Sequence, residues 1–153
     1  MMDSSEAVVA DTKQYIVVKI DNEQYGIDIG YVDNIVRMQR ITRVPKAQDY
    51  FEGVINLRGE VIPVMSMRKK FCLDDDVITG KTRIIILKTD QQALIGVQVD
   101  EVKEVVTLSE SEVDKITYDK KQEDNNTYLS GIGKHDGELI SLLDINAVIS
   151  EEE

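Results

Sequence analysis

The chain contains a single histidine, His135, the one side chain that could act as an imidazole base near neutral pH. It lies in the segment Gly-Lys-His-Asp-Gly at 133–137, where the flanking glycines predict a tight turn. A Ser-His-Asp arrangement is compatible with the sequence, but no G-x-S-x-G motif is present to position a nucleophilic serine. The pattern favours an exposed turn histidine, and a single histidine excludes metal sites that need two. We therefore predict no catalytic residue.

Three further patterns could bind a ligand, and each has a simpler interpretation. Glycines at 131, 133 and 137 are not followed by a helix that could meet a dinucleotide pyrophosphate, so tight-turn glycines are favoured. The aspartates at 74–76 lack the alternating spacing of a calcium loop, which favours a solvated loop. Cys72 follows a basic run that would favour a reactive thiolate, whereas a lone cysteine is more often a buried apolar filler. We predict neither a metal nor a cofactor.

Composition indicates a folded, soluble protein. Of the 153 residues, 42% are hydrophobic and 31% charged, and the formal charge of −11 argues against nucleic acid or an anionic membrane as the main partner. One cysteine excludes an internal disulfide, and no apolar run is long enough to span a membrane. Residues 1–13 do not have the pattern of a secretory signal, so we expect a cytoplasmic protein.

Charge is unevenly distributed along the sequence. Residues 37–70 hold eight basic and three acidic residues, a net charge of +5 against −16 for the rest of the chain. Such a band can steer the docking of an acidic partner protein, although ordinary surface charge explains it equally well.

Short apolar runs predict an all-β fold with short helical turns, built as a small barrel or sandwich. Strands are expected at 15–20, 25–29, 61–67 and 139–143, with polar loops at 73–82 and 118–127 and mobile ends at 1–13 and 151–153. Pro63 places its strand at a sheet edge or a bulge, because proline cannot donate to a ladder. The apolar triplets 32/35/36 and 102/105/106 fit either a helical turn or a bent strand. Asp144 is expected to cap a C-terminal helical turn that runs through Ile149.

The sequence contains an internal repeat. At a shift of 70, the apolar residues and the glycine at 26–36 fall on residues of the same kind at 96–106. At a shift of 78, Gly53 falls on Gly131 and residues 59–62 fall on 137–140. The polar residues 118–127 are the natural place for the insertion that changes the shift. We predict a duplicated β subdomain with approximate halves 14–82 and 83–150, packed tightly around a groove because each half alone would be marginally stable.

Residues 53–64, which read GVINLRGEVIPV, resemble the signature of the CheW family, adaptor proteins of bacterial chemotaxis. Segments 24–29, 43–45, 50–53, 82–106 and 128–133 also fit, so the resemblance covers about residues 14–150. It implies two packed five-stranded SH3-like β-barrels with no catalytic activity. It also implies a scaffold that joins the cytoplasmic tips of chemoreceptors to the regulatory domain of a histidine kinase in membrane-associated arrays. Adaptor and kinase domains touch through opposite subdomains in such arrays, and self-association of the adaptor is left open.

The resemblance further implies binding residues. The receptor tip is expected in the groove between the subdomains, against Val32, Asn34, Ile35, Gly53, Asn56, Arg58 and Gly59. Val32 and Ile35 would form an apolar floor, Gly53 would allow close backbone approach, and Gly59 is more naturally a turn residue. Arg58 offers five donors to carboxylates or free carbonyls, although it could instead tie the two barrels together. Asn34 stands where the family commonly has glutamate, which puts one ion pair with the receptor in doubt. The candidate kinase contacts are Thr42, Arg43, Val44 and Tyr118.

Other functions are kept as alternatives. The chain could be the kinase's own regulatory domain, although its ends are expected to be those of a free-standing protein. It could also be an adaptor joined to a receiver domain, for which no residues remain. An oligonucleotide-binding barrel is disfavoured by the charge and by an aromatic content of 5%, and an enzyme by the absence of catalytic motifs.

Overall fold

The computed structural model describes residues 11–116 and 128–149, and most of its regular structure is β. The strands expected at 15–20, 25–29, 61–67 and 139–143 are present, with Ile29 and Met67 lying just outside theirs. Thr12 and Lys13, expected to be mobile, already belong to the first strand. Residues 1–10 and 151–153 and the expected loop 118–127 lie outside the described residues. The elements are β1 (Thr12–Ile20), β2 (Glu23–Asp28), η1 (Ile29–Tyr31), β3 (Val32–Arg37), β4 (Phe51–Leu57), β5 (Glu60–Ser66), α2 (Met67–Lys70), β6 (Arg83–Lys88), β7 (Leu94–Val99), β8 (Glu101–Ser109), η2 (Glu110–Glu112), β9 (Val113–Lys115), β10 (Leu129–His135), β11 (Glu138–Leu143) and α4 (Ile145–Ile149).

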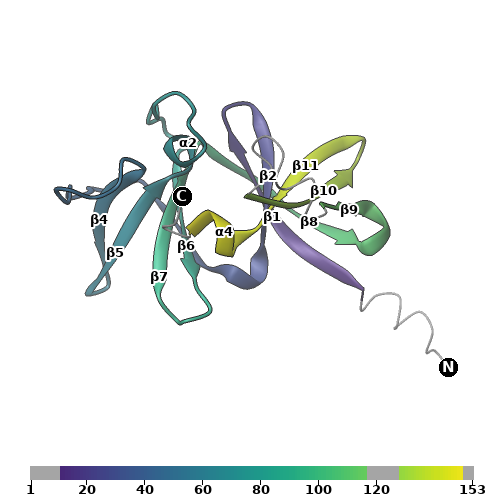
Figure 1. The fold of residues 1–153 in the computed structure, drawn as a ribbon, viewed down its shortest axis with the longest axis horizontal. Helices are drawn as coiled ribbons and strands as arrows, with labels where there is room; N and C mark the ends of the chain where they lie inside the picture. The colour runs from purple at the N-terminus through teal and green to yellow at the C-terminus, as the bar shows by residue number, and fades with distance from the viewer. Residues whose placement is uncertain (1–10, 117–127, 150–153) are drawn as a thin grey trace.

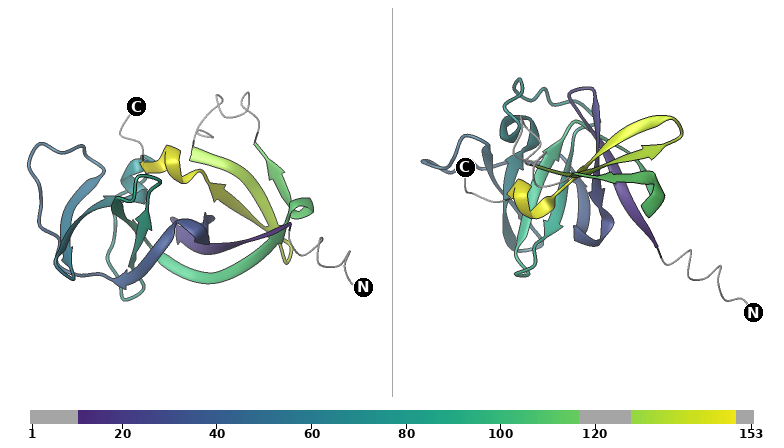
Figure 2. Two further views of the ribbon diagram at one scale, coloured as in Figure 1. Left: turned by 90° about the horizontal axis from the view of Figure 1, so that it is seen from below. Right: turned by 45° about the vertical axis from the view of Figure 1, so that its right-hand side comes forward.

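The strands form two sheets that lie side by side (Figure 1). The middle sheet, ordered β3-β6-β7-β5-β4, uses the middle of the chain, and the terminal sheet, ordered β8-β1-β2-β11-β10-β9, uses the two ends. Figure 2 shows how strongly the strands of the terminal sheet curve. The all-β class with two packed subdomains is confirmed, with six and five strands where five each were expected. Since β1 and β2 join β8–β11, each sheet combines strands from both repeat halves.

The sequence repeat relates the two sheets strand by strand. Gly26 pairs with Leu142 in the parallel ladder between β2 and β11, and Gly96 pairs with Val64 in the parallel ladder between β7 and β5. The glycines differ by 70 in number and their partners by 78, which are the two shifts found in the sequence. A Cβ atom added to Gly26 would lie 2.8 Å from Leu142 Cδ2, and one added to Gly96 would lie 2.8 Å from Ile84 Cγ2. At Gly26 the close contact lies across the parallel ladder, whereas at Gly96 it lies with β6 on the other side of β7, and Val64 Cγ2 across the parallel ladder would be 3.4 Å away.

Alternate side chains of the inner strands fill different cores. Residues 16, 18 and 20 of β1 and residues 85 and 87 of β6 pack in the seam between the sheets. Residue 17 of β1 fills the interior of the terminal sheet, and residues 84 and 86 of β6 fill the interior of the middle sheet. Because both faces are covered, residues 84–87 are apolar without alternation. We call the shared cluster the seam core; its buried members are Ile16, Val18, Ile20, Ile27, Tyr50, Met65, Met67, Ile85, Leu87, Ile95, Val97, Val99, Leu143, Ile145 and Val148.

The two ambiguous apolar triplets are bent strands, not helical turns. Residues 32, 35 and 36 lie on β3, whose pairing with β6 shifts register between Val32 and Asn34. Residues 102, 105 and 106 lie on β8, whose pairing with β1 shifts register opposite Val17 and Val18. An irregular register bends a strand, which explains why the apolar positions depart from a period of two. The helical turn that the resemblance implied is reduced to the short η1 before β3.

Pro63 lies on β5, an inner strand of the middle sheet, and not on an edge strand as one interpretation required. Its partner Val54 exchanges both backbone hydrogen bonds with Thr42 on the other side of β4, at 2.8 and 2.9 Å. Val54 and Pro63 therefore form a non-hydrogen-bonded pair, and the nitrogen of Pro63 points away from β4. The ladder from β5 to β7 begins only at Val64, so no strand needs the missing N–H.

The C-terminal turn is capped as the sequence predicts. The Asp144 carboxylate accepts from the backbone N–H of Ala147 at 3.3 Å, and α4 directs Ile145 and Val148 into the seam core. Among the described residues, no helix has the length and apolar character needed to cross a membrane.

Candidate interaction surfaces

The residues expected to bind a receptor fall into two groups. Val32, Asn34 and Ile35 lie on β3, and the others lie on β4 or in the turn that follows it. In the strand order of the middle sheet, β3 and β4 are the two outermost strands. The structure therefore places these residues at both edges of one curved sheet, not along a single helical turn.

The β3 group borders the seam. Val32 packs against the seam core, and Ile35 is 36% exposed. The side-chain oxygen of Asn34 accepts from the backbone N–H of Ile35 at 2.8 Å, so this amide is oriented locally. On β8, the repeat-equivalent Val102 packs against the same core, and Val105, equivalent to Ile35, is also exposed. The repeat at a shift of 70 aligns Val102 and Val105 with Val32 and Ile35 of β3, but neither was predicted as a surface residue. This shift is the sequence signal that could have identified them.

Arg58 and Gly59 form the two-residue turn between β4 and β5, with φ of 54° and 85°. Positive φ at both positions is the geometry of a type I′ hairpin, which glycine adopts without strain. The Arg58 side chain is exposed and forms no hydrogen bond or ion pair with any residue of 11–116 or 128–149. Among these residues, then, Arg58 does not tie the barrels together, and its donors point to solvent. Asn56, two residues earlier, is also exposed.

Gly53 serves a contact inside the chain. It is buried, with φ of 142°, and a Cβ atom there would overlap the backbone carbonyl of Thr42. Its repeat equivalent Gly131 faces the carbonyl of Asp114 in the same way, with 3.0 Å available for a Cβ atom. The close backbone approach expected at Gly53 therefore exists, but the approaching backbone belongs to residue 42.

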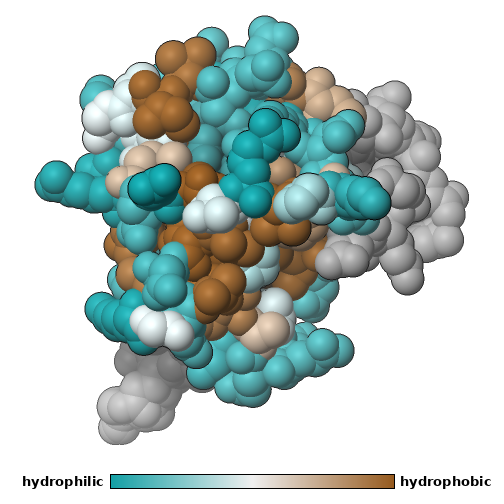
Figure 3. Space-filling model, turned by 90° about the vertical axis from the view of Figure 1, so that its left-hand side faces the viewer, coloured by the Kyte–Doolittle hydropathy of each residue, from teal (hydrophilic) through white to brown (hydrophobic). Residues whose placement is uncertain are grey.

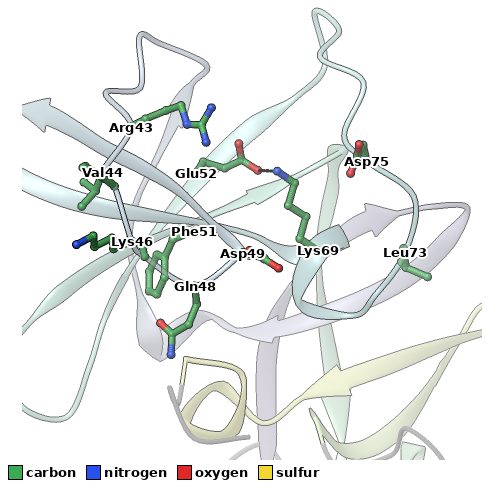
Figure 4. A pocket seen from close by; sticks show the side chains of 12 residues that line it. Arg43, Val44, Lys46, Gln48, Asp49, Phe51, Glu52, Lys69, Leu73 and Asp75 are labelled. Atoms are coloured by element: carbon green, nitrogen blue, oxygen red, sulfur yellow. Dashed lines mark ion pairs between the residues drawn. The ribbon is translucent and has the colours of Figure 1, made fainter.

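Residues 38–50, which we call the basic loop, border a cavity of about 580 Å³ on the middle sheet (Figure 4). Arg43 and Val44 line it together with Phe51, and Thr42 attaches the loop to β4. A smaller apolar hollow of about 260 Å³ adjoins it, lined by Val44, Ala47, Gln48, Phe51, Gly53, Val54 and Pro63. Figure 3 shows hydrophobic side chains gathered on this side of the molecule between polar ones. Three expected kinase contacts thus share one surface, whereas Tyr118 lies outside the described residues.

The floor of this cavity is fixed by α2. Lys69 pairs with Glu52 at 3.1 Å across the cavity (Figure 4). The Ser66 hydroxyl caps α2 by accepting from the N–H of Lys69 at 3.1 Å, and donates to Asp76 at 2.6 Å. This bond shows that the aspartates at 74–76 are partly used inside the fold.

The next residue of α2, Arg68, joins the two sheets. Its guanidinium donates to both carboxylate oxygens of Asp100, at 2.7, 3.0 and 3.1 Å, where the chain passes from β7 to β8. Asp21, in the turn between β1 and β2, lies 3.6 Å from Arg68 and donates its backbone N–H to Asp100 at 2.8 Å. Burial is the largest influence on the pKa of Asp100 and would raise it, but the hydrogen bonds and charge of Arg68, with the Asp21 N–H, outweigh burial and lower this pKa.

The other candidate residues take no part in these surfaces. His135 ends β10, with Nε2 3.4 Å from the exposed Asp136, and no serine among the described residues bonds to it. Cys72 is exposed, so the interpretation as a buried filler is wrong. Gly131 and Gly133 lie inside β10 and not in tight turns. Within residues 11–116 and 128–149, no group of three or more potential ligands could hold a metal ion.

Known proteins match the chain over nearly its whole length. The CheW family, described as a CheW-like domain, matches residues 14–153. The chain is 36% identical over 146 residues to the chemotaxis protein CheW of Bacillus subtilis (strain 168), covering 95% of this chain and 92% of that protein. It is 32% identical over 133 residues to the chemotaxis protein CheW of Thermotoga maritima, covering 87% and 85%. The crystal structure of the scaffolding protein TtCheW from Thermoanaerobacter tengcongensis has a TM-score of 0.77 at 31% identity and covers 86% of this chain and 88% of that one. Sequence and fold together show that the chain belongs to the CheW-like family.

Proposed function

We propose that the chain is a non-catalytic scaffold that couples chemoreceptors to a histidine kinase in chemotaxis. The observation that carries the proposal is the exposure of apolar and basic side chains on the middle sheet, at β3, at the turn after β4 and on the basic loop. The proposed receptor contacts lie on β3 at one edge of the middle sheet and at the turn after β4 at the other, and the proposed kinase contacts lie on the basic loop with its cavity. The membership of the chain in the CheW-like family supports this assignment.

The receptor surface combines apolar and polar groups. Val32 and Ile35 offer an apolar strip beside the seam, on which the apolar face of a receptor helix can rest. Arg58 offers a planar fork of donors, which suits a carboxylate or the free carbonyls at a helical hairpin tip. Asn56 and Gly59 flank it, and Asn34 is held by its own bond to the backbone. Gly53 is buried against the backbone of Thr42, so any part it has in this surface is indirect.

The kinase surface is the side of the middle sheet that carries Thr42, Arg43 and Val44. Val44 is 47% exposed at the border of the cavity and the apolar hollow, where it can anchor a partner side chain. Thr42 attaches the loop to the edge of β4 through two backbone hydrogen bonds with Val54. Tyr118 is proposed as a further kinase contact from the family resemblance alone.

A scaffold of this kind acts through geometry. Both surfaces lie on the middle sheet, so a displacement at the receptor surface can reach the kinase surface through the strands of that sheet. Individual contacts of modest affinity are sufficient, because many linked contacts in an array raise the effective concentration. The proposal includes a cytoplasmic location at membrane-associated receptor arrays.

Separation of the two binding activities tests this function. Binding of a receptor cytoplasmic fragment and of the kinase regulatory domain is measured by calorimetry for Ile35→Asp, Val44→Asp and Val77→Asp. Val77 is 75% exposed and lies on neither surface, so its variant is the matched control. Ile35→Asp is expected to weaken receptor binding at least tenfold and spare kinase binding, and Val44→Asp the reverse. A wild-type chain that binds neither partner would refute the function.

A further inference from the structure

A second cavity of about 480 Å³ lies beside the middle sheet, lined from β4, β7, α2, the start of the basic loop and the loop of residues 73–82. It adjoins the cavity of the basic loop and shares Glu52, Lys69 and Asp75 with it (Figure 4). Of the proposed receptor and kinase contacts that the structure describes, none lines this second cavity. We call it the β7 cavity, because the residue that distinguishes it, Gln98, lies on that strand.

Gln98 is the one polar side chain on a strand whose other residues are apolar or glycine. Ile95, Val97 and Val99 fill the seam core, so by alternation Gln98 faces the opposite side, toward the interior of the middle sheet. It is 2% exposed and lines the β7 cavity, and its side-chain amide makes no hydrogen bond within the part of the chain that the structure describes. A buried amide without a partner destabilises a fold, whereas a leucine would fill a similar volume without that cost, which indicates a partner that binds in the cavity.

The charged groups that line the β7 cavity are three carboxylates and one ammonium. The Oε2 atom of Glu52 is buried and accepts no hydrogen bond from the described residues, although Lys69 Nζ lies 3.1 Å away in an ion pair. Asp76 accepts from the Ser66 hydroxyl with one carboxylate oxygen, at 2.6 Å. Asp75 is exposed, and its side chain has neither a hydrogen bond nor an ion pair among residues 11–116 and 128–149. The cavity therefore has a net charge of −2 and acceptors left over on β4 and on the loop of residues 73–82.

The rest of the lining is mostly apolar. Met38 and Ile41 are partly buried against the interior cluster of the middle sheet, and Ile78, which is 54% exposed, lines the cavity as well. Such side chains suit the methylene stem of a long cationic group whose charged head stays with polar atoms. The net charge disfavours an anion, and a purely apolar ligand would leave the amide of Gln98 without a partner. The lining therefore favours a cation with an aliphatic stem.

We propose that the β7 cavity binds an alkyl guanidinium group: the side-chain oxygen of Gln98 and the carboxylates accept its N–H groups, and the apolar side chains hold its stem. A guanidinium has five donors in one plane and is weakly hydrated, so it can serve acceptors from several elements at once. An ammonium has three donors on a compact, strongly hydrated charge and fits this arrangement less well. Two sources present the guanidinium, a free small molecule and an arginine side chain of another polypeptide. The site is independent of the proposed function, because binding can be measured on the chain alone.

The test is an NMR titration of the whole isotope-labelled chain, in which the side-chain amide signal of Gln98 reports binding directly and the backbone signals of residues 75–78 report it in the variants. N-acetyl-arginine amide presents the arginine side chain as a polypeptide does, and agmatine is a free small guanidinium. N-acetyl-citrulline amide has nearly the same shape without the charge, and N-acetyl-lysine amide has an ammonium instead.

Three variants locate the site. Gln98→Leu removes the amide at similar volume, and Asp75→Asn removes the charge of the unpaired carboxylate. Asp74→Asn makes the same change at the neighbouring residue, which is also exposed and is not among the lining residues, so it is the matched control.

N-acetyl-arginine amide is expected to bind with a dissociation constant of about 1 mM or below, which a ligand of its size allows. The lysine analogue should bind at least about threefold more weakly, and the citrulline analogue at least about tenfold more weakly. Gln98→Leu should weaken binding at least about tenfold without lowering the melting temperature, because it removes a buried amide that has no partner. Asp75→Asn should weaken binding about threefold, and Asp74→Asn by less than about 1.5-fold.

The ligands and variants decide different parts of the proposal. Similar affinities of agmatine and N-acetyl-arginine amide would support both sources, and binding of one of them alone would assign the site to that source. Equal binding of the arginine analogue and either control ligand would overturn the choice of a guanidinium. Unchanged binding in Gln98→Leu would overturn the site, as would equal effects of Asp75→Asn and Asp74→Asn, which decide the matter if Gln98→Leu does not fold. Absence of binding by both guanidinium ligands at about 20 mM would mean that only water hydrates this amide, and would leave the proposed function intact.

Discussion

Replacement of Arg68 by methionine tests the connection between the sheets. The guanidinium donates three hydrogen bonds to Asp100, and the two side chains are 16% and 24% exposed. Breaking a fully buried ion pair lowers the free energy of unfolding by roughly 3–5 kcal/mol. Because this pair keeps some hydration, we expect Arg68→Met to lower the free energy of unfolding by about 2–4 kcal/mol. For a chain of this size, that corresponds to a fall in melting temperature of roughly 5–12 °C.

The loss should also depend on pH. The folded-state pKa of Asp100 is lowered, so its contribution to wild-type stability is complete above the ordinary aspartate pKa of about 3.9 and is lost as pH falls through the lowered value. In Arg68→Met, burial is no longer opposed by the guanidinium and disfavours the charged carboxylate. The variant's deficit should therefore be largest at pH 7 and shrink toward pH 4, where protonation relieves the buried charge.

Urea unfolding at pH 7 and at pH 4 measures both effects. Arg58→Met is the matched control, since it removes the same charge from an exposed side chain without a partner among the described residues, and should change the free energy of unfolding by less than about 0.5 kcal/mol. Equal stabilities of Arg68→Met and the wild type would refute the reasoning. A deficit of the same size at both pH values would refute the part that concerns Asp100.

Three further predictions concern single residues. Arg58→Glu should weaken binding of a receptor fragment at least tenfold in calorimetry while the melting temperature stays within about 2 °C; an unfolded variant would instead make Arg58 structural. Gly26→Ala should destabilise the fold by about 1–3 kcal/mol in urea titration, because the added methyl would lie 2.8 Å from Leu142, whereas Gly80→Ala meets open space and should be nearly neutral. If both glycine variants behave alike, the close approach in the parallel ladder is not limiting. Asp144→Ala should cost about 1 kcal/mol through loss of the α4 cap, measured by thermal unfolding, and a gain in stability would contradict the capping role.

The sequence predicted local structure well, because strands and turns depend on neighbouring residues. The glycines at 26 and 96 revealed the repeat, and Gly59 marked the hairpin turn that exposes Arg58. The exchange of strands between the halves could not be predicted, since tandem barrels and exchanged barrels need the same apolar pattern and the same two shifts. Contacts between distant residues were also invisible: nothing in the neighbourhood of Gly53 indicates that the carbonyl of Thr42 lies against it.

Because contacts between distant residues cannot be predicted from the sequence, only some of the surface residues were predicted. Motif resemblance named residues on β3 and on the turn after β4, and the structure puts them on opposite edges of one sheet. It did not indicate that residues 38–50 and 109–116 occupy equivalent positions, because the insertion hides their alignment and only the pairings of Thr42 and Asp114 restore it.

Because strands are exchanged between the repeat halves, the order of synthesis differs from the order of pairing, and the repeat boundary is not a boundary between sheets. The hairpin of β1 and β2 is synthesised before the other described strands, but its partners β8 and β11 follow only after the strands of the middle sheet. Both outer edges of the hairpin therefore stay unpaired until β8 and β11 have been synthesised, so the terminal sheet is expected to form late in folding. If the chain were divided at the repeat boundary, the hairpin of β1 and β2 would be separated from its partners β8 and β11. Neither fragment would then contain all the strands of one sheet. Recombination within the family should tolerate breaks near residues 30 and 100, where the chain passes from one sheet to the other, far better than a break at the midpoint.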